Sequence, residues 1–377
     1  MRLGPHELPN RLLVAPMAGV TDRPFRQLCR RLGAGYAVSE MITSLPGLWH
    51  TAKTRRRADH SGEPGPVAVQ IAGTEPHQMA HAARHNIDHG AQIIDINMGC
   101  PARKVCNRWA GSALMRNEPL ALAIIDAVVA ACAPKGVPVT LKMRTGWNDA
   151  ERNAVRLARA ADAAGVAMIT VHGRTREQGY RGHAEYDTIA AVKDAVRVPV
   201  VANGDIDTPW RAREVLQRTG ADALMIGRAA QGRPWIFREI AQFLDTGTLP
   251  PPPATRDVAR WLLEHLDDHH ALYGPDVGAR SARKHIGWAV RGLPGGAALR
   301  TRLNELDDAQ AQRAALSAYF EHLADIHPLL PLPLDTADVD DHGAISRIAP
   351  ASGHAARGGN ALAVHARSGS EYGVPAP

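Results

Sequence analysis

Residues 93–105 read IIDINMGCPARKV, an apolar run that passes directly into a turn with a thiol and two cationic side chains. The first four residues predict a buried strand, so Cys100 is expected at the carboxyl end of that strand. We expect Gly99 to permit the turn and Pro101 to stiffen it. Because a cysteine that only fills a core needs neither a turn nor neighbouring charges, the pattern indicates a reactive position.

Seven other apolar runs resemble this one, and stretches with helical periodicity separate them along the chain. Most runs are continuous, which is typical of parallel strands that are buried on both faces. Eight strand–helix repeats in about 240 residues match the size of a (βα)8 TIM barrel. An open doubly wound sheet is the alternative, disfavoured because no GxGxxG motif follows the first run. The expected strands are residues 12–15, 36–39, 67–71, 93–97, 139–143, 168–171, 198–202 and 223–226, and the expected helices include 77–89, 119–132, 151–164 and 210–218.

A proline-rich segment at residues 246–255 ends this pattern and is expected to be a linker. We therefore expect an α/β fold, with a TIM barrel over residues 1–245 and a small all-helical domain over residues 255–327. The segment 335–377 is rich in Ala, Gly, Ser and His and lacks periodicity, which predicts disorder. The helical patterns beyond the linker are residues 256–272, 279–290, 298–306 and 308–324.

The composition argues against several classes of protein. The four cysteines of the 377-residue chain form no CxxC pair and no Cys/His cluster with zinc spacing, so we expect neither a disulfide framework nor a metal site. No window holds the ~18 apolar residues of a membrane span, and residues 1–10 show no signal sequence. We expect a cytoplasmic protein without membrane contacts. Cys29 and Cys132 are expected in the core, and Cys106 in a structural role.

The net charge is +6 at pH 7, and arginines gather in separate clusters at residues 26–31, 55–57 and 280–302. A solvated surface is the plain interpretation of any one cluster. Several clusters together favour a polyanionic partner.

Polar residues follow most of the predicted strands, at the end where a TIM barrel builds its active site. Buried without partners, each would cost several kcal/mol, so a bound polar ligand is expected to supply the partners. The loops after the seventh and eighth strands predict a phosphate site, because glycines let the backbone approach closely and Arg228 offers a planar fork. The strand-end residues that we single out are Gln70, Lys142, His172, Asn203, Gly204, Asp205, Gly227 and Arg228.

Gln70 and Lys142 suit a flavin in particular. The amide of Gln70 can both donate to and accept from the pyrimidine-like edge of the ring. A lysine inside a buried strand is costly unless it meets an anion, and Lys142 can stabilise negative charge near N1 of the reduced ring. His172 is expected to add a donor, and a satisfied core histidine is the alternative.

Two roles are open for Cys100. An unperturbed thiol has a pKa of about 8.5, so at neutral pH it is mostly protonated and can act as a general acid. Arg103 and Lys104 would instead favour the thiolate and a nucleophilic role, unless their side chains serve RNA phosphates. The sequence leaves these alternatives open.

The chain resembles the tRNA-dihydrouridine synthases, and most closely their bacterial DusB-type branch. The resemblance covers roughly residues 5 to 325 and is more specific in the barrel than in the helical domain. The matching segments are APMAGVTD (15–22), DINMGCPARKV (95–105), LKMRTGW (141–147), TVHGRTREQG (170–179), VANGDI (201–206), MIGRAAQGRPW (225–235) and SARKH (281–285).

This resemblance implies an FMN-bound barrel that reduces the C5–C6 bond of specific tRNA uridines to 5,6-dihydrouridine, with NADPH as the reductant. It also implies that C6 receives a hydride and that Cys100 protonates C5. We expect tRNA as the partner, held by the arginine-rich faces, and a monomeric enzyme. The family's FMN contacts fall on Pro16, Met17, Ala18, Gln70, Lys142, Asn203, Gly204, Asp205, Gly227 and Arg228, and His172 lies where the family approaches the flavin phosphate.

Two other functions remain as alternatives. A flavin barrel such as dihydropyrimidine or dihydroorotate dehydrogenase would act on a small metabolite, but it would not need the basic helical region after residue 253. An RNA-binding protein that keeps the barrel as a scaffold would not need Cys100 or a complete set of FMN contacts.

Overall fold

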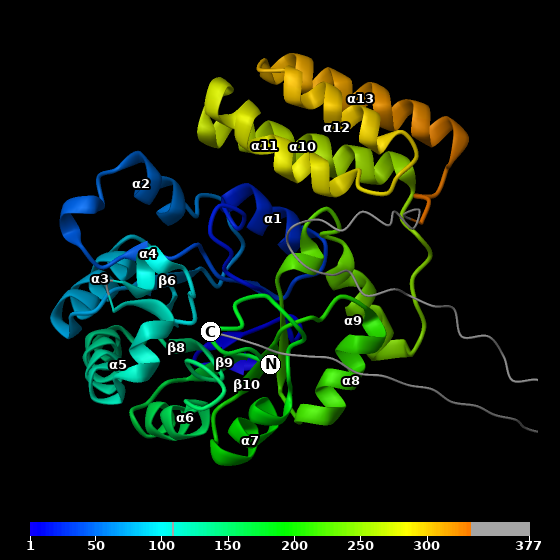
Figure 1. Ribbon diagram of the computed structural model, residues 1–377. Coiled ribbons are helices and arrows are strands. Elements are labelled where there is room, and N and C mark those ends of the chain that lie inside the picture. The colour runs from blue at the N-terminus through cyan, green and yellow to red at the C-terminus, as the bar shows by residue number, and fades with distance from the viewer. Residues whose placement is uncertain (108, 333–377) are drawn as a thin grey trace, which may run out of the picture. The chain divides into compact units, whose positions relative to one another are not determined.

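The computed structural model describes residues 1–107 and 109–332, and the predicted disordered tail at 335–377 lies outside the described residues. Within this part, a nine-stranded sheet has the order β4-β3-β11-β10-β9-β8-β7-β6-β5, and neighbouring strands are parallel. Helices surround these strands (Figure 1). The strands are β3 (Leu12–Val14), β4 (Tyr36–Ala37), β5 (Ile42–Thr43), β6 (Ala68–Ala72), β7 (Ile93–Met98), β8 (Val139–Arg144), β9 (Met168–His172), β10 (Val200–Asn203) and β11 (Ala223–Ile226).

The sheet closes on itself because its two edge strands are successive pieces of one chain segment. Only residues 38–41 separate β4 from β5, and β4 pairs with β3 whereas β5 pairs with β6. Val38 forms a further parallel bridge with Ala68, and the N–H of Ser39 donates to the Ala68 carbonyl at 3.0 Å. The predicted TIM barrel is therefore confirmed, with β4 and β5 together as its second strand.

Every predicted strand run contains a strand, and helices follow in the expected order. The predicted helix at 151–164 begins three residues late, at Ala154, because Asn148 Oδ1 accepts the N–H groups of Ala150 and Glu151 and holds a turn before it. The helices of the barrel are α1 (Arg23–Arg31), α2 (Ala52–Ala58), α3 (Pro76–Asp88), α4 (Arg103–Cys106), α5 (Glu118–Cys132), α6 (Ala154–Ala163), α7 (Asp187–Ala195), α8 (Pro209–Thr219) and α9 (Ile236–Thr246).

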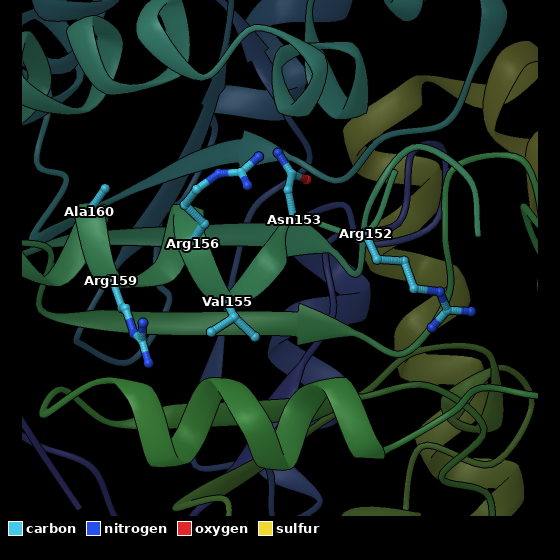
Figure 2. A pocket seen from close by; sticks show the side chains of 6 residues that line it. All are labelled: Arg152, Asn153, Val155, Arg156, Arg159 and Ala160. Atoms are coloured by element: carbon cyan, nitrogen blue, oxygen red, sulfur yellow. The ribbon is translucent and has the colours of Figure 1, made fainter. Parts of the chain in front are cut away.

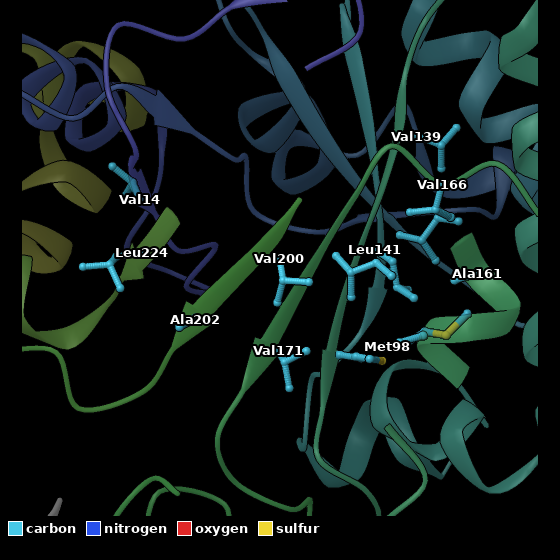
Figure 3. Close-up of a cluster of buried hydrophobic side chains, with 14 of the residues drawn as sticks. Val14, Met98, Val139, Leu141, Ala161, Val166, Val171, Val200, Ala202 and Leu224 are labelled. Carbon is cyan, nitrogen blue, oxygen red and sulfur yellow. The ribbon is translucent and has the colours of Figure 1, made fainter. Parts of the chain in front are cut away.

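The main hydrophobic core lies between the strands and the surrounding helices. Alternate strand residues point to this side of the barrel wall, among them Val14, Leu141, Val171 and Leu224 (Figure 3). Cys29 and Cys132 belong to the same core, where both are fully buried.

A second apolar cluster fills the barrel interior, and an N-terminal hairpin that the sequence did not predict contributes to it. The hairpin pairs β1 (Arg2–Leu3) with β2 (His6–Glu7). Leu3 and Leu8 pack in one cluster with interior strand residues such as Ile93. These short strands escape prediction because two residues cannot show a periodic pattern.

Beyond residue 254 the described chain is helical, as predicted. Helices α10 (Thr255–Tyr273), α11 (Pro275–Ala289), α12 (Gly296–Glu305) and α13 (Ala309–Ile326) pack around their own apolar cluster. Leu28 and Leu32, from the α1 region of the barrel, join that cluster. The exact domain boundaries stay a prediction. Among the described residues, no helix has the length and apolar character needed to cross a bilayer.

Candidate active site

The interior face of the barrel changes from apolar to polar along its strands. Ala68 and Ile93 belong to the interior apolar cluster, whereas Gln70 and Asp95, two residues further on, are polar and buried. Side chains two residues apart on a strand share a face, so the polar groups gather at the carboxyl end of the barrel. Further polar residues of this face lie on β7, β8, β9 and β10. They are Asn97, Thr140, Lys142, Thr170, His172 and Asn203.

A hydrogen-bond network fixes the amide of Gln70 in this polar layer. Gln70 Nε2 donates to Asp95 Oδ2 at 2.7 Å, and Gln70 Oε1 accepts from Asn97 Nδ2 at 2.6 Å. Thr140 Oγ1 donates to the other Asp95 oxygen at 2.6 Å. Burial raises the pKa of Asp95 to about 6, although the hydrogen bonds and Lys142 oppose this shift. Asp95 had no predicted role, although a carboxyl group inside an apolar strand is itself a signal.

Asn97 also holds the loop that carries Cys100. Its Oδ1 accepts from the backbone N–H groups of Gly99 and Cys100 at 3.1 and 3.0 Å. Ser112 Oγ donates to the Cys100 carbonyl at 2.9 Å, and Arg144 Nε donates to the Gly99 carbonyl at 2.8 Å. The thiol is partly exposed, and its partial burial raises its pKa. The protonated thiol is therefore favoured at neutral pH, which supports the acid role over the thiolate.

The expectation that Gly99 permits this turn was wrong. Gly99 does not have a positive φ, and a Cβ there would lie 3.5 Å from the Lys142 carbonyl oxygen, an ordinary contact. The side chain of Asn97 holds the turn instead, through the two hydrogen bonds that it accepts.

The cations near the thiol also differ from those expected. Arg103 is exposed at the start of α4, and the side chain of Lys104 lies outside the described residues. Arg144 and Lys142 are the cations that act on the Cys100 thiol, and they only partly offset the effect of burial on its pKa.

Lys142 extends from β8 toward β10. Its Nζ donates to Asn203 Oδ1 at 3.1 Å, and Asn203 Nδ2 donates to the Met225 carbonyl at 2.8 Å. Burial lowers the pKa of Lys142 to about 8, with Arg144 adding to the shift and Asp95 opposing it. Within residues 1–107 and 109–332, Lys142 forms no ion pair, so its charge is available to a bound anion.

Asp205 binds two arginines at the ends of β9 and β11. Arg174 donates to both carboxylate oxygens at 2.9 and 2.6 Å, and Arg228 Nη2 donates to Oδ1 at 3.0 Å. The N–H of Ala184 donates to Oδ2 at 2.7 Å. Burial alone would raise the pKa of Asp205, but these partners outweigh it and the net shift is downward. The carboxylate is thus occupied, and it positions the two guanidinium groups.

The two glycines of the predicted phosphate site differ. Gly204 has a φ of +126°, and a Cβ there would lie 2.6 Å from Ala184 Cβ, so both backbone and space require glycine. Gly227 has a φ of −113°, and its Cβ would lie 3.5 Å from Met17 Sδ, an ordinary contact. Glycine is therefore required by the protein's own packing at Gly204, whereas the expected close approach of the backbone to a phosphate stays a prediction at both positions.

His172 is buried beside these arginines. Its Nε2 lies 3.4 Å from Arg174 Nη1, and burial, reinforced by Arg144, lowers its pKa well below the usual range. Because Arg174 can only donate, Nε2 of His172 is the acceptor in this contact. We infer that the neutral ring carries its proton on Nδ1. Tyr180 was not predicted at this site. Its exposed ring lies below the guanidinium groups of Arg144 and Arg228, at 5.6 and 5.1 Å.

Glu40 fixes the loop after β3. It lies in the break between β4 and β5, and its Oε2 accepts from the N–H of Gly19 at 2.7 Å. The same oxygen pairs with Arg57 Nε at 3.1 Å. This loop contributes Pro16 and Met17, both partly exposed, and Ala18, which is exposed.

The arginine clusters divide into structural and exposed groups. Arg26 is buried and pairs with Glu63, so its predicted surface role is wrong. Arg280, Arg300 and Arg302 are exposed, and no ion pair between described residues involves them. No neighbouring carboxylate of the described residues therefore neutralises these three guanidinium groups.

A hollow on helix α6 is a separate feature of the outer ring of helices (Figure 2). Three of its polar side chains, those of Arg152, Asn153 and Arg156, are already paired. Asn153 and Arg156 each donate to Glu118 at 2.6 Å, and Arg152 donates to Glu185 at 2.9 Å. The hollow draws on α6 and its N-terminal loop and includes none of the strand-end residues, so we do not assign the active site to it.

The sequence and the fold were compared with those of known proteins, and both comparisons give matches over most of the chain. A family model described as dihydrouridine synthase (Dus) matches residues 13–324. The tRNA-dihydrouridine synthase B of Xanthomonas axonopodis pv. citri is 57% identical over 331 residues, covering 88% of this chain and 99% of that protein. The protein of the same name from Pseudomonas aeruginosa is 58% identical over 320 residues, covering 85% and 96%. A solved 2-naphthoyl-CoA reductase complex matches with a TM-score of 0.53 at 12% identity, covering 89% of this chain and 70% of that chain, which supports the fold alone. The chain therefore belongs to the dihydrouridine synthase family, whose members are oxidoreductases.

Proposed function

We propose that this protein is a cytoplasmic tRNA-dihydrouridine synthase that reduces the C5–C6 double bond of specific uridines, with FMN as cofactor and NADPH as reductant. The observation that carries the proposal is the Cys100 loop, which Asn97 holds on the same polar layer as Gln70. The names of the two bacterial relatives support tRNA as the substrate. That similarity disfavours a small-metabolite dehydrogenase, since the family match extends through the helical region to residue 324. A monomer stays a prediction.

The donors of the barrel mouth fit a flavin mononucleotide. Arg228 is exposed and is aimed by Asp205, so it can bind a phosphate. The glycine at position 204 lets the adjoining backbone N–H groups approach that phosphate. Lys142 supplies a cation for the pyrimidine-like end of the ring, and the amide of Gln70 supplies a neutral donor and acceptor. We propose that the loop at residues 16–18 covers the other side of the ring.

Cys100 is proposed to complete the reduction as a general acid. Once bound and reduced by NADPH, FMN would supply the hydride that C6 of the uracil ring receives. The Sγ–H bond of Cys100 then breaks and its proton goes to C5, which leaves a thiolate that regains a proton from solvent. The raised pKa of the thiol keeps it protonated before the reaction, and its partial exposure allows the return of the proton.

A uridine within folded RNA must leave its stack to reach the barrel mouth. We propose that the exposed Arg280, Arg300 and Arg302 hold the RNA backbone while the base enters. Phosphate contacts of this kind release counterions, so the affinity for tRNA should fall steeply as salt rises. A flat response to salt would count against this part of the proposal.

The test of the proposed function is Cys100→Ala, assayed on tRNA from cells that lack this protein. Dihydrouridine formation should nearly cease, whereas the absorbance of bound flavin should match that of the wild type. Cys132→Ala removes a buried core thiol instead and serves as the control, with turnover retained. Full activity of Cys100→Ala would refute the acid role, and a wild-type protein that purifies without flavin would refute the cofactor.

A further inference from the structure

Three buried side chains from distant parts of the sequence meet where the barrel contacts helix α10. Asp22 ends the loop after β3 and caps the first turn of α1. His265 and His269 lie one turn apart on α10, so both rings leave the same face of that helix. One ligand atom from each of the three residues lies within 4.8 Å of those from the other two.

Each residue of this cluster keeps one ligand atom without a well-aligned hydrogen bond within the described part of the chain. Asp22 Oδ1 accepts the N–H of Phe25 at 3.1 Å, but Oδ2 has no hydrogen-bond partner among the described residues. Oδ2 lies 3.2 Å from His269 Nδ1, although the two atoms lack the alignment of a hydrogen bond. His265 Nε2 is equally unpartnered within that part of the chain. Three buried polar atoms thus lie together without well-aligned partners, an arrangement that is costly unless a cation joins them.

The other nitrogen of His269 is held in the manner of a metal ligand. His269 Nε2 lies 2.7 Å from Ser281 Oγ on α11, which orients the ring and leaves Nδ1 directed at Asp22. Metal-bound histidines almost always make such a contact through their second nitrogen.

A small cavity adjoins the cluster and gives room for a fourth ligand. Its volume is about 10 Å³, enough for one water molecule, and His265, His269 and His285 are among the residues that line it. Nε2 of His285 has no hydrogen-bond partner among the described residues either. The fourth position can therefore be taken by water.

We propose that Asp22, His265 and His269 form a Zn²⁺ site that joins helix α10 to the loop following β3. Two imidazole nitrogens and one carboxylate oxygen suit Zn²⁺ better than Mg²⁺ or Ca²⁺, which prefer oxygen alone. A simple ion pair between protonated His269 and Asp22 is the competing explanation. It accounts for one contact but leaves His265 Nε2 without a partner.

The site would act on the geometry of the barrel mouth and not on the reaction itself. Asp22 follows directly on residues 16–21, and Lys284 of α11 donates to the carbonyl of Gly19 in the same loop. A bound ion would thus fix this loop and α10 to each other, which positions the helical region relative to the barrel rim.

The experiment measures Zn²⁺ bound to the full-length flavoprotein by equilibrium dialysis and elemental analysis. The wild type should hold about one ion per chain after dialysis, and His265→Asn with His269→Asn should lose it. His270→Asn, one position further along α10, and His85→Asn with His89→Asn, in an exposed histidine group, serve as controls that retain the ion. A wild-type protein that binds no more Zn²⁺ than the double variant would overturn the proposal.

A second measurement covers the case in which the double variant does not fold. Ser281→Ala keeps all three ligands but removes the contact to His269 Nε2, so Zn²⁺ should bind about 10- to 100-fold more weakly. In addition, Zn²⁺ should raise the melting temperature of the wild type and EDTA should reverse the increase. Unchanged affinity in Ser281→Ala together with an unaffected melting temperature would favour the ion pair and refute the metal site.

Discussion

Replacing Asp95 by Asn should change how the stability of the protein depends on pH. Burial raises the pKa of this carboxyl group from 3.8 to about 6, so the folded state binds the proton more tightly than the unfolded state does. The stabilisation by that proton is complete below about pH 4 and is lost as the pH rises through about 6. The contribution of Asp95 to the stability of the wild type should therefore fall as the pH rises from about 4 to above 6.

The size of the effect follows from the difference between the two pKa values. A change from 3.8 to about 6 corresponds to about 3 kcal/mol of unfolding free energy. An Asn at this position cannot titrate, but its oxygen can still accept from Gln70 Nε2, and its amide can donate to Thr140 Oγ1. The variant should therefore gain up to about 3 kcal/mol relative to the wild type between pH 4 and pH 7.

Urea denaturation of both proteins at several pH values measures this difference. Titrating groups that do not interact with Asp95 are common to the two proteins and cancel when their free energies of unfolding are subtracted. Lys142 does not cancel, because Asp95 raises its pKa, so the comparison is read below the pKa of Lys142 of about 8. A difference that stays constant from pH 4 to pH 7 would refute the buried, weakly acidic state of Asp95. A difference that falls with pH would mean that hydrogen bonding outweighs burial at this site.

Four further changes test other parts of the site. Arg228→Gln should weaken FMN binding about 10- to 100-fold, because a charged hydrogen bond to phosphate is worth about 1.5–3 kcal/mol; fluorescence titration of the apoprotein measures this. Gly204→Ala should lower the stability by about 1–3 kcal/mol in thermal melts, because the new Cβ meets Ala184 and the φ is unfavourable. Turnover should stay level across neutral pH and fall only under alkaline conditions, since burial raises the pKa of Cys100; a fall already below pH 7 in the pH–rate profile would contradict this. Arg302→Gln should reduce the slope of log affinity against log salt by about 0.7–0.9 in tRNA binding, whereas an unchanged slope would place this arginine outside the interface.

The barrel was predictable because apolar runs and helical periodicity recur with a regular spacing. The break in the second strand was not, since residues 36–43 contain too few residues on either side of it to show a pattern. The N-terminal hairpin was missed for the same reason. Helix α6 begins at residue 154 because the side chain of Asn148 holds a turn before it. Hydrophobic periodicity gives no information on such a turn.

The candidate site was predictable as far as it depends on strand ends. Cys100, Lys142 and Asn203 follow from their place at the ends of apolar runs. The part played by Asp95 depends on contacts with Gln70 and Thr140, which come from other strands and become visible only in the folded barrel.

The histidine cluster shows a different limit of sequence analysis. Spacing rules search for ligands that lie near one another in the chain, and they led to the expectation of no metal site. Asp22 lies far from His265 and His269 in sequence, so only the packing of α1 against α10 brings the three together.

The gap between β4 and β5 has a mechanical consequence. Residues within a sheet use their backbone groups to hydrogen-bond to adjacent strands. Glu40 lies in the gap between two strands, and its side chain connects the loop after β3 to Arg57 on α2. A displacement of either segment would pull on this shared carboxylate. The loop after β3 and helix α2 are thus coupled through a single acidic side chain, independently of the hydrogen bonds of the barrel wall.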